Sequence, residues 1–282
     1  MKKLTPLFLS IFWTFISCQD VITVDPPTEA PRLSIDALIR IDESLTVTTA
    51  VINVSLSNSF FGQTEPTDVD LISIRNIDYP SDDLNQNILI LEKSNQGEYS
   101  GAKETEFFTN GSLELYIEHN NERYYAQTIY VPTVPIETLE EGNQTLFTGE
   151  ETEIVLSITD TPNRTDFYLF DFSFNEYLVS EDTFYKGQNF EFSYFYEDGL
   201  RSGYSLEVSV MGVDEQFYNY MNQIIVQAGG DQGPFQTPAA TVRGNIINIT
   251  NGLDTVSEDQ ESNYPLGYFS VSQEFKKTIT LE

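Results

Sequence analysis

Apolar and polar residues alternate along much of the chain from residue 33 onward. In the segment 33–41 every second residue, beginning with Leu33, is apolar, and most of the residues between are polar. A period of two places successive side chains on opposite faces of a β-strand, so the pattern predicts a strand with one buried face. The segment 45–51 repeats the pattern, and we expect its buried face to consist of Leu45, Val47, Thr49 and Val51.

The clearest signal of two paired strands lies between residues 113 and 131. Two alternating segments, 113–118 and 123–131, flank the polar residues 119–122. This arrangement predicts a β-hairpin with a four-residue polar loop. Pro132 ends the second strand, because proline lacks the N–H group that a sheet requires.

The second half of the chain combines short strands rich in aromatic residues with one helix. Two rows of alternating aromatic side chains, within 167–174 and 190–196, suit packing between neighbouring strands, and we interpret both rows as core. Asp214 suits the N-cap of a helix over 214–228, and Gly229 suits its end. The apolar residues of this segment recur at helical spacing, at Phe217, Tyr220, Met221, Ile224, Ile225 and Ala228.

Many short strands separated by polar turns predict a mostly β fold with two antiparallel, sandwich-like domains. We expect residues 32–132 to form an immunoglobulin-like N-terminal sandwich, and residues 150–282 to form a C-terminal β domain that contains the one helix. The acidic, proline-marked segment 133–149 is predicted to link them. A chain of 282 residues exceeds the usual size of one domain, which agrees with two.

The N-terminus is typical of a bacterial lipoprotein signal. Two lysines precede an apolar run, residues 4–16, which is shorter than the roughly 20 residues that a membrane-spanning helix needs. Ser17 supplies a small residue before Cys18, the single cysteine. We therefore expect residues 1–17 to be a signal peptide and Cys18 to carry acyl chains such as palmitate, with residues 18–31 as a flexible tether. The alternative is an ordinary secretory signal that ends near a chance cysteine.

Composition narrows the classes of function. The formal net charge is −30, and it becomes −32 once the two N-terminal lysines are removed, so we expect no nucleic-acid partner. With one histidine, His119, and no second cysteine, the chain cannot build a multi-histidine zinc site or a disulfide. A Ser-His-Asp triad would have to use His119, which lies in the polar loop of the predicted hairpin. We therefore expect no enzymatic activity and no cofactor.

An ordered set of short motifs in the C-terminal third resembles one family. The motifs are the segment 214–220, Pro234-Phe235, Pro238, Gly244-Asn245-Ile246 and Leu266-Gly267-Tyr268-Phe269. Together with the cysteine signal they resemble the Bacteroidota lipoprotein family called domain of unknown function 4249, over roughly residues 18–282. The resemblance implies an outer-membrane lipoprotein, often encoded beside a TonB-dependent receptor, and Gln19 in place of an aspartate agrees with export to that membrane. Gly244 by itself predicts a bulge or a close approach of two backbones.

Two candidate sites fall in the acidic segment 254–261. Its carboxylates belong to Asp254, Glu258, Asp259 and Glu261. Carboxylates are ligands that calcium prefers, but these lack the spacing of a calcium-binding loop, so we predict no metal site and keep the four as candidates. The three residues that begin at Asp254 resemble the O-glycosylation acceptor of this bacterial group, which would place the sugar on Thr255.

Three hypotheses about function follow from these observations. The leading one is a non-enzymatic accessory lipoprotein, held to the outer membrane by its N-terminal lipid, that binds a TonB-dependent β-barrel receptor or its ligand. It leaves open whether the protein faces the periplasm or the cell surface. The second is a carbohydrate- or peptide-binding surface module whose aromatic strand residues, Tyr194 and Tyr196 among them, face solvent. The third is a carboxylate-dependent hydrolase, which needs two acids about 5–9.5 Å apart in a cleft.

Overall fold

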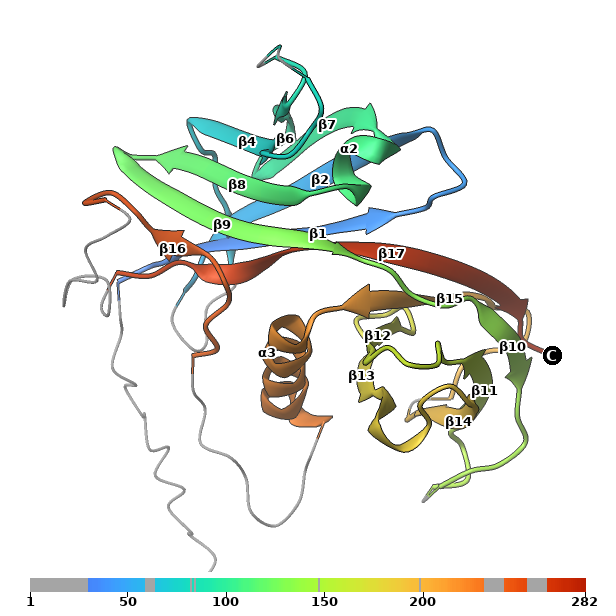
Figure 1. The fold of residues 1–282 in the computed structure, drawn as a ribbon. Helices are drawn as coiled ribbons and strands as arrows, with labels where there is room; N and C mark the ends of the chain where they lie inside the picture. The colour runs from blue at the N-terminus through green and yellow to red at the C-terminus, as the bar shows by residue number, and fades with distance from the viewer. Residues whose placement is uncertain are drawn as a thin grey trace, which may run out of the picture.

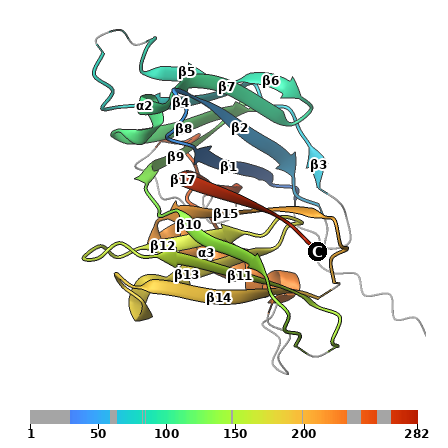
Figure 2. The ribbon, with the colours of Figure 1, turned by 90° about the vertical axis from the view of Figure 1, so that its right-hand side faces the viewer.

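The computed structural model describes residues 30–58, 64–81, 83, 85–146, 148–197, 199–230, 241–252 and 263–282. β-strands dominate this part of the chain and build two units, which lie one above the other (Figure 1, Figure 2). The predicted fold class is confirmed: the protein is mostly β, with sandwich-like units and one long helix among the described residues.

The first unit contains the strands that precede residue 132. They are β1 (Leu33–Ile41), β2 (Val47–Leu56), β3 (Glu65–Pro66), β4 (Leu71–Asn76), β5 (Ile88–Ile90), β6 (Glu92–Asn95), β7 (Glu98–Glu104), β8 (Ser112–His119) and β9 (Glu122–Val131), with the short helix α2 (Thr105–Thr109) after β7. The last strand of the chain, β17 (Leu266–Thr280), lies in the middle of this sheet, between β9 and β1. The strands run in the order β5-β4-β8-β9-β17-β1-β2-β7-β6, and their inward side chains form one core.

The second unit contains the elements between residues 136 and 230. They are β10 (Ile136–Glu141), β11 (Thr152–Thr159), β12 (Phe167–Asp171), β13 (Tyr177–Glu181), the 3-10 helix η1 (Asp182–Phe184), β14 (Asn189–Tyr196), β15 (Ser205–Val213), α3 (Glu215–Ile225) and the π-helical turn η2 (Val226–Gly230). Strands β10, β11 and β14 form a separate sheet, whereas β15, β12 and β13 extend from β17. The two sheets enclose the second core.

The aromatic rows of β12 and β14 form much of this second core, as predicted. Phe172 of the first row stacks on Tyr194 of the second, with ring centres 4.0 Å apart. Tyr196 is buried as well, and its hydroxyl donates to the carbonyl oxygen of Phe172. Phe174 is the exception, because it lies beyond the end of β12 in the turn that follows and is exposed.

β17 belongs to both units. Its first half pairs in parallel with β1, from Leu266 opposite Ser34 to Gln273 opposite Ile41. Its second half pairs antiparallel with β15, as Figure 2 shows at the boundary between the units. The predicted division placed all of residues 150–282 in the second domain, whereas strand pairing brings the first half of β17 and the short β16 (Ile247–Asn248) into the first sheet. Alternation along a strand indicates its two faces but not its pairing partners. The sequence therefore did not indicate that β17 passes from one unit to the other.

Glycine and asparagine make the return to the first unit possible. Gly267 has a φ of 98°, and a Cβ added there would lie 1.8 Å from the carbonyl oxygen of Ile35. A Cβ at Gly244 would lie 1.6 Å from the carbonyl oxygen of Gly267, so the predicted close approach of two backbones is confirmed. Asn245 then bonds through its side chain to both the N–H and the carbonyl oxygen of Phe269, each at 2.8 Å.

The face of β2 was predicted wrongly. Val47 and Val51 point outward and are half exposed, whereas Ala50 and Ile52 are buried in the first core. Leu45, before the strand begins, is exposed too. Both alternating series of this strand contain apolar residues, so the periodicity identifies a strand without identifying its buried face.

The β8–β9 hairpin is confirmed, but its loop is shorter than predicted. His119 still pairs with Glu122, which leaves a turn of two residues, Asn120 and Asn121. Both have positive φ, 50° and 65°, a conformation that asparagine tolerates better than most residues. Two consecutive residues with positive φ allow a turn of two residues, whereas the sequence predicted a loop of four.

The predicted helix is confirmed as α3. Its N-cap is Asp214, whose Oδ1 accepts the N–H of Phe217 at 2.7 Å. The helix gives way to the π-helical turn shortly before the glycine pair predicted to end it. No helix in the described residues has the length and apolar character needed to cross a membrane.

Candidate functional site

A groove of about 620 Å³ lies at the junction of the two units. One wall is the outer face of the first sheet, with Asp36 of β1 and Val51 of β2. The opposite wall is α3, with Tyr220, Met221 and Ile224. Figure 1 shows how α3 lies beneath the sheet at this level. The volume falls in the range of roughly 300–1,000 Å³ that is typical of ligand sites.

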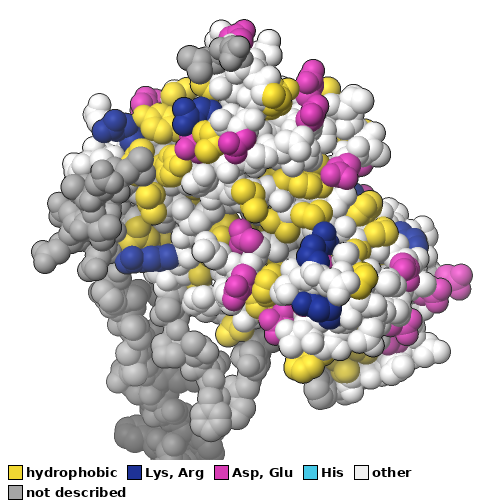
Figure 3. Space-filling view, in the orientation of Figure 1, with side chains coloured by type: hydrophobic (Ala, Val, Ile, Leu, Met, Phe, Trp, Pro, Cys, Tyr) yellow, Lys and Arg dark blue, Asp and Glu magenta, His cyan; other side chains and the backbone are white. Residues whose placement is uncertain are grey.

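The groove exists because two apolar surfaces cover each other incompletely. The apolar face of α3 contains one buried residue, Phe217, whereas Met221 and Ile224 are only partly covered. Across from them Val51 is 41% exposed. On the side shown in Figure 3, hydrophobic side chains also gather along the junction, with acidic and basic side chains among them. Apolar side chains in this state gain burial when a ligand or partner covers them.

An ion-pair network crosses the groove. Arg40 of β1 donates to Asp171 of β12 at 2.7 Å and to Glu274 of β17 at 3.1 Å. Lys276 lies 3.7 Å from the same Glu274. Burial opposes the charge of Arg40, but the two carboxylates outweigh it and raise its pKa above the ordinary value. Because Arg40 belongs to the first unit and Asp171 to the second, the network joins the two units beside the groove.

Asp36 differs from the other charged residues of the groove. It is exposed, and among the described residues its side chain has neither a hydrogen bond nor an ion pair. Its neighbour on β17 is Tyr268, whose ring centre lies 5.1 Å from that of Tyr220. Burial, and then the charge of Asp36, raises the pKa of Tyr220 to about 12. The same carboxylate adds to the raised pKa of Tyr177, after burial and Asp171.

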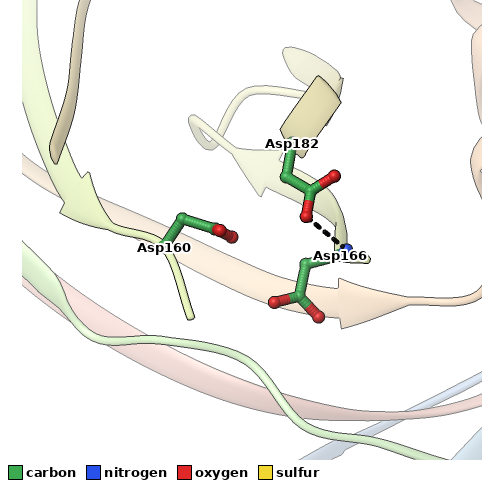
Figure 4. A group of neighbouring side chains, drawn as sticks. All are labelled: Asp160, Asp166 and Asp182. Atoms are coloured by element: carbon green, nitrogen blue, oxygen red, sulfur yellow. Dashed lines mark hydrogen bonds between the residues drawn. The ribbon is translucent and has the colours of Figure 1, made fainter. Parts of the chain in front are cut away.

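Three buried aspartates form a second cluster, in the second unit. Asp160 follows β11, Asp166 precedes β12 and Asp182 begins η1. Their carboxylate oxygens lie within 4.8 Å of one another (Figure 4). Asp182 also accepts the N–H of Asp166 at 3.0 Å, which Figure 4 marks with a dashed line. Burial, with the two neighbouring carboxylates, raises the pKa of Asp166 despite an opposing contribution from Arg164.

Protein donors already occupy much of this cluster. The Tyr168 hydroxyl donates to two of the three aspartates, and the N–H of Gly187 donates to Asp160 at 2.7 Å. Arg164 pairs with the second aspartate, and Lys186 lies 3.6 Å from the third. Carboxylates of this kind are ligands that calcium prefers, but two cations of the chain already offset two of the three carboxylate charges here. We interpret the cluster as structural: its hydrogen bonds hold the end of β11 next to the start of β12.

The candidate residues from the sequence occupy different positions in the structure. Cys18, Thr255 and the four acidic candidates of 254–261 lie outside the described residues and stay predictions. His119 ends β8, with its Nε2 2.9 Å from the side-chain amide of Asn120, which suits an ordinary turn residue. Tyr194 and Tyr196 pack in the second core, so they do not form the exposed aromatic platform that the second hypothesis requires.

Sequence reasoning missed both the groove and the aspartate cluster. The three aspartates belong to different elements and follow no motif spacing. For the groove one signal was present, since β2 carries apolar residues on both faces, which is typical of a strand covered on both sides. That signal predicts a covering element but does not reveal that α3 provides it.

The fold and the groove define a mostly β protein with two units and a groove at their junction. The chain belongs to the family described as domain of unknown function (DUF4249), which it matches over residues 19–278. No curated protein is detectably similar to it. Among solved structures, it is similar to a Ca²⁺-stabilized adhesin that helps an Antarctic bacterium reach out and bind ice. The TM-score is 0.21 and the identity 10%, with 68% of this chain and 47% of that chain covered, so the chain spans about half of that structure.

Proposed function

We propose that the protein is a non-catalytic lipoprotein of the outer membrane that binds a partner in the groove between its units. The observation that carries the proposal is the groove itself, where partly exposed apolar side chains of α3 and β2 face each other. Folding has left these side chains incompletely buried, and exposed apolar surface of this kind marks interaction sites.

The proposed membrane anchor is Cys18 with its acyl chains. Its support is the short apolar run that ends at this cysteine. Two or more acyl chains attach a protein stably, whereas one attaches it only weakly. We expect Cys18→Ala to move the protein from the membrane fraction to the soluble fraction and to abolish incorporation of labelled fatty acid. A variant that still sediments wholly with membranes contradicts the anchor.

The proposed partner is a TonB-dependent β-barrel receptor, supported by the family resemblance rather than by any contact in the structure. In a pull-down from detergent-solubilised outer membranes, the wild type should recover this barrel. Ile224→Gln keeps a good helix former but removes an apolar side chain from the groove, so it should lower recovery severalfold. Asn222→Gln, at an exposed position of the same helix, is the matched control. Failure of the wild type to recover any barrel protein contradicts the choice of partner.

The absence of catalysis is part of the proposal. A carboxylate-dependent hydrolase needs a pair of acids free to act. Of the acids that line the groove in the described residues, Glu274 is held by Arg40 and Lys276, which leaves Asp36 by itself. This arrangement favours binding over hydrolysis.

A further inference from the structure

Asp36 is the unbalanced charge of the groove. The other charged residues that line it are Arg40, Lys276 and Glu274. They are joined to one another, to Asp171 and, through Lys276, to Glu207. Asp36 stands outside this network, with no partner among the residues that the structure describes. A ligand that enters the groove therefore meets a carboxylate that no cation of the described residues already pairs with.

Aromatic side chains line the same groove as this carboxylate. Tyr220 and Tyr268 lie with ring centres 5.1 Å apart, and Phe217 meets Tyr268 edge-on at 4.9 Å. Tyr177 of β13 also lines the groove. The face of an aromatic ring attracts a cation, and the attraction adds to that of a nearby carboxylate. Asp36 and its aromatic neighbours thus form a setting suited to a positive group.

The remaining lining suits the apolar part of such a ligand. Val51, Met221 and Ile224 offer partly covered apolar surface. Lysine and arginine carry long apolar stems that lie along surface of this kind while the charged head reaches a polar site. The net charge of −30 also attracts a basic partner at long range.

We infer that the groove binds the lysine or arginine side chain of a partner segment whose neighbouring residues are apolar, with Asp36 as the counter-charge. The inference rests on the proposed function, since it names the ligand of the same groove. It commits to a basic peptide segment rather than to a sugar, an acidic peptide or a second copy of this chain.

Methionine provides a reporter inside the groove. Met221 lines it. Met211 is fully buried in a third core, the junction core, with Leu169, Val213, Phe217 and Tyr268, and it serves as an internal control. The full chain, labelled with ¹³C at its methionine methyl groups, is titrated with three capped tripeptides: valine–lysine–valine, valine–glutamine–valine and valine–glutamate–valine. We expect the Met221 signal to shift and the Met211 signal to stay in place. The lysine peptide should bind about fivefold tighter than the glutamine peptide, and the glutamate peptide more weakly still.

Two variants separate the role of Asp36 from that of net charge. Asp36→Asn should remove the preference for lysine. Glu92→Gln removes the same unit of charge from an exposed position on β6 and should keep the preference. An equal loss of preference in both variants shows a long-range effect of net charge and overturns the role of Asp36.

The remaining outcomes distinguish this inference from the proposed function. Equal affinity for the lysine and glutamine peptides overturns the inference while leaving binding in the groove intact. No Met221 shift with any peptide also overturns it, and the membrane pull-down then decides the proposed function separately. A Met221 shift that depends on protein concentration in the absence of peptide assigns the groove to a second copy of the chain and overturns the inference as well.

Discussion

Gly267 is the residue on which the crossing of β17 between the units depends most. Its φ of 98° disfavours a side chain, and an added Cβ would meet the carbonyl oxygen of Ile35 at 1.8 Å. We expect Gly267→Ala to lower the free energy of unfolding by about 3 kcal/mol, through strain and displacement of β1. Gly203→Ala is the control, because Gly203 has a φ of 83° but no atom within 4 Å of an added Cβ, so it should lose only about 1 kcal/mol. Urea denaturation measures both, and equal losses contradict the steric argument.

Asp166 gives the protein a pH dependence of definite sign. Burial raises its pKa above 3.8, so the folded state holds the proton more tightly than the unfolded state. The contribution of this group to stability is therefore present at low pH and is lost as pH rises from about 3.8 through the folded pKa. Asp166→Asn lacks this titration. We expect urea denaturation to show the wild type gaining stability relative to the variant as pH falls from about 7 to about 4.5. A difference that is constant, or that grows with pH, contradicts the assignment.

At the scale of elements, the start of α3 supports both the helix and the groove. Asp214 accepts the N–H of Phe217 and also lies 3.3 Å from the Tyr268 hydroxyl. Asp214→Ala should cost about 1 kcal/mol of unfolding free energy, because an N-cap acceptor is lost. Asp214→Asn should stay close to the wild type, since asparagine caps equally well. Equal destabilisation by both variants in urea would show that the charge, rather than the cap, matters.

Elements defined by local patterns could be predicted from the sequence. The alternation of 33–41 gave β1, the two alternating segments around Asn120 gave the β8–β9 hairpin, and helical spacing with an N-cap gave α3. The buried face of β2 was predicted wrongly because both of its faces are apolar. The parallel pairing of β17 with β1 was missed because it joins segments more than two hundred residues apart, and periodicity carries no information about such partners.

The candidate site was less predictable than the elements for a related reason. Asp36, Tyr177 and Tyr220 come from β1, β13 and α3, and only the pairing of β17 with both units brings them together. Composition set limits on chemistry, since a single histidine restricts the active sites available. It could not locate a groove, because the groove results from where two units meet.

At the scale of the whole molecule, the shared strand should make the two units unfold together. β17 lies in the middle of the first sheet and also pairs with β15 of the second unit. The junction core adds apolar contacts between the two units. We expect one calorimetric transition, with equal calorimetric and van 't Hoff enthalpies. Two resolved transitions contradict the view that the shared strand couples the units.

The central claim is that a partner binds in the groove between the units, and crosslinking in intact cells tests it most directly. A photoreactive benzoylphenylalanine replaces Ile224 in the groove or Glu92 on the exposed strand β6. After irradiation and mass spectrometry, we predict that the first position captures an outer-membrane β-barrel receptor and the second does not. No adduct from position 224, or equal yields of the same adduct from both positions, contradicts the claim.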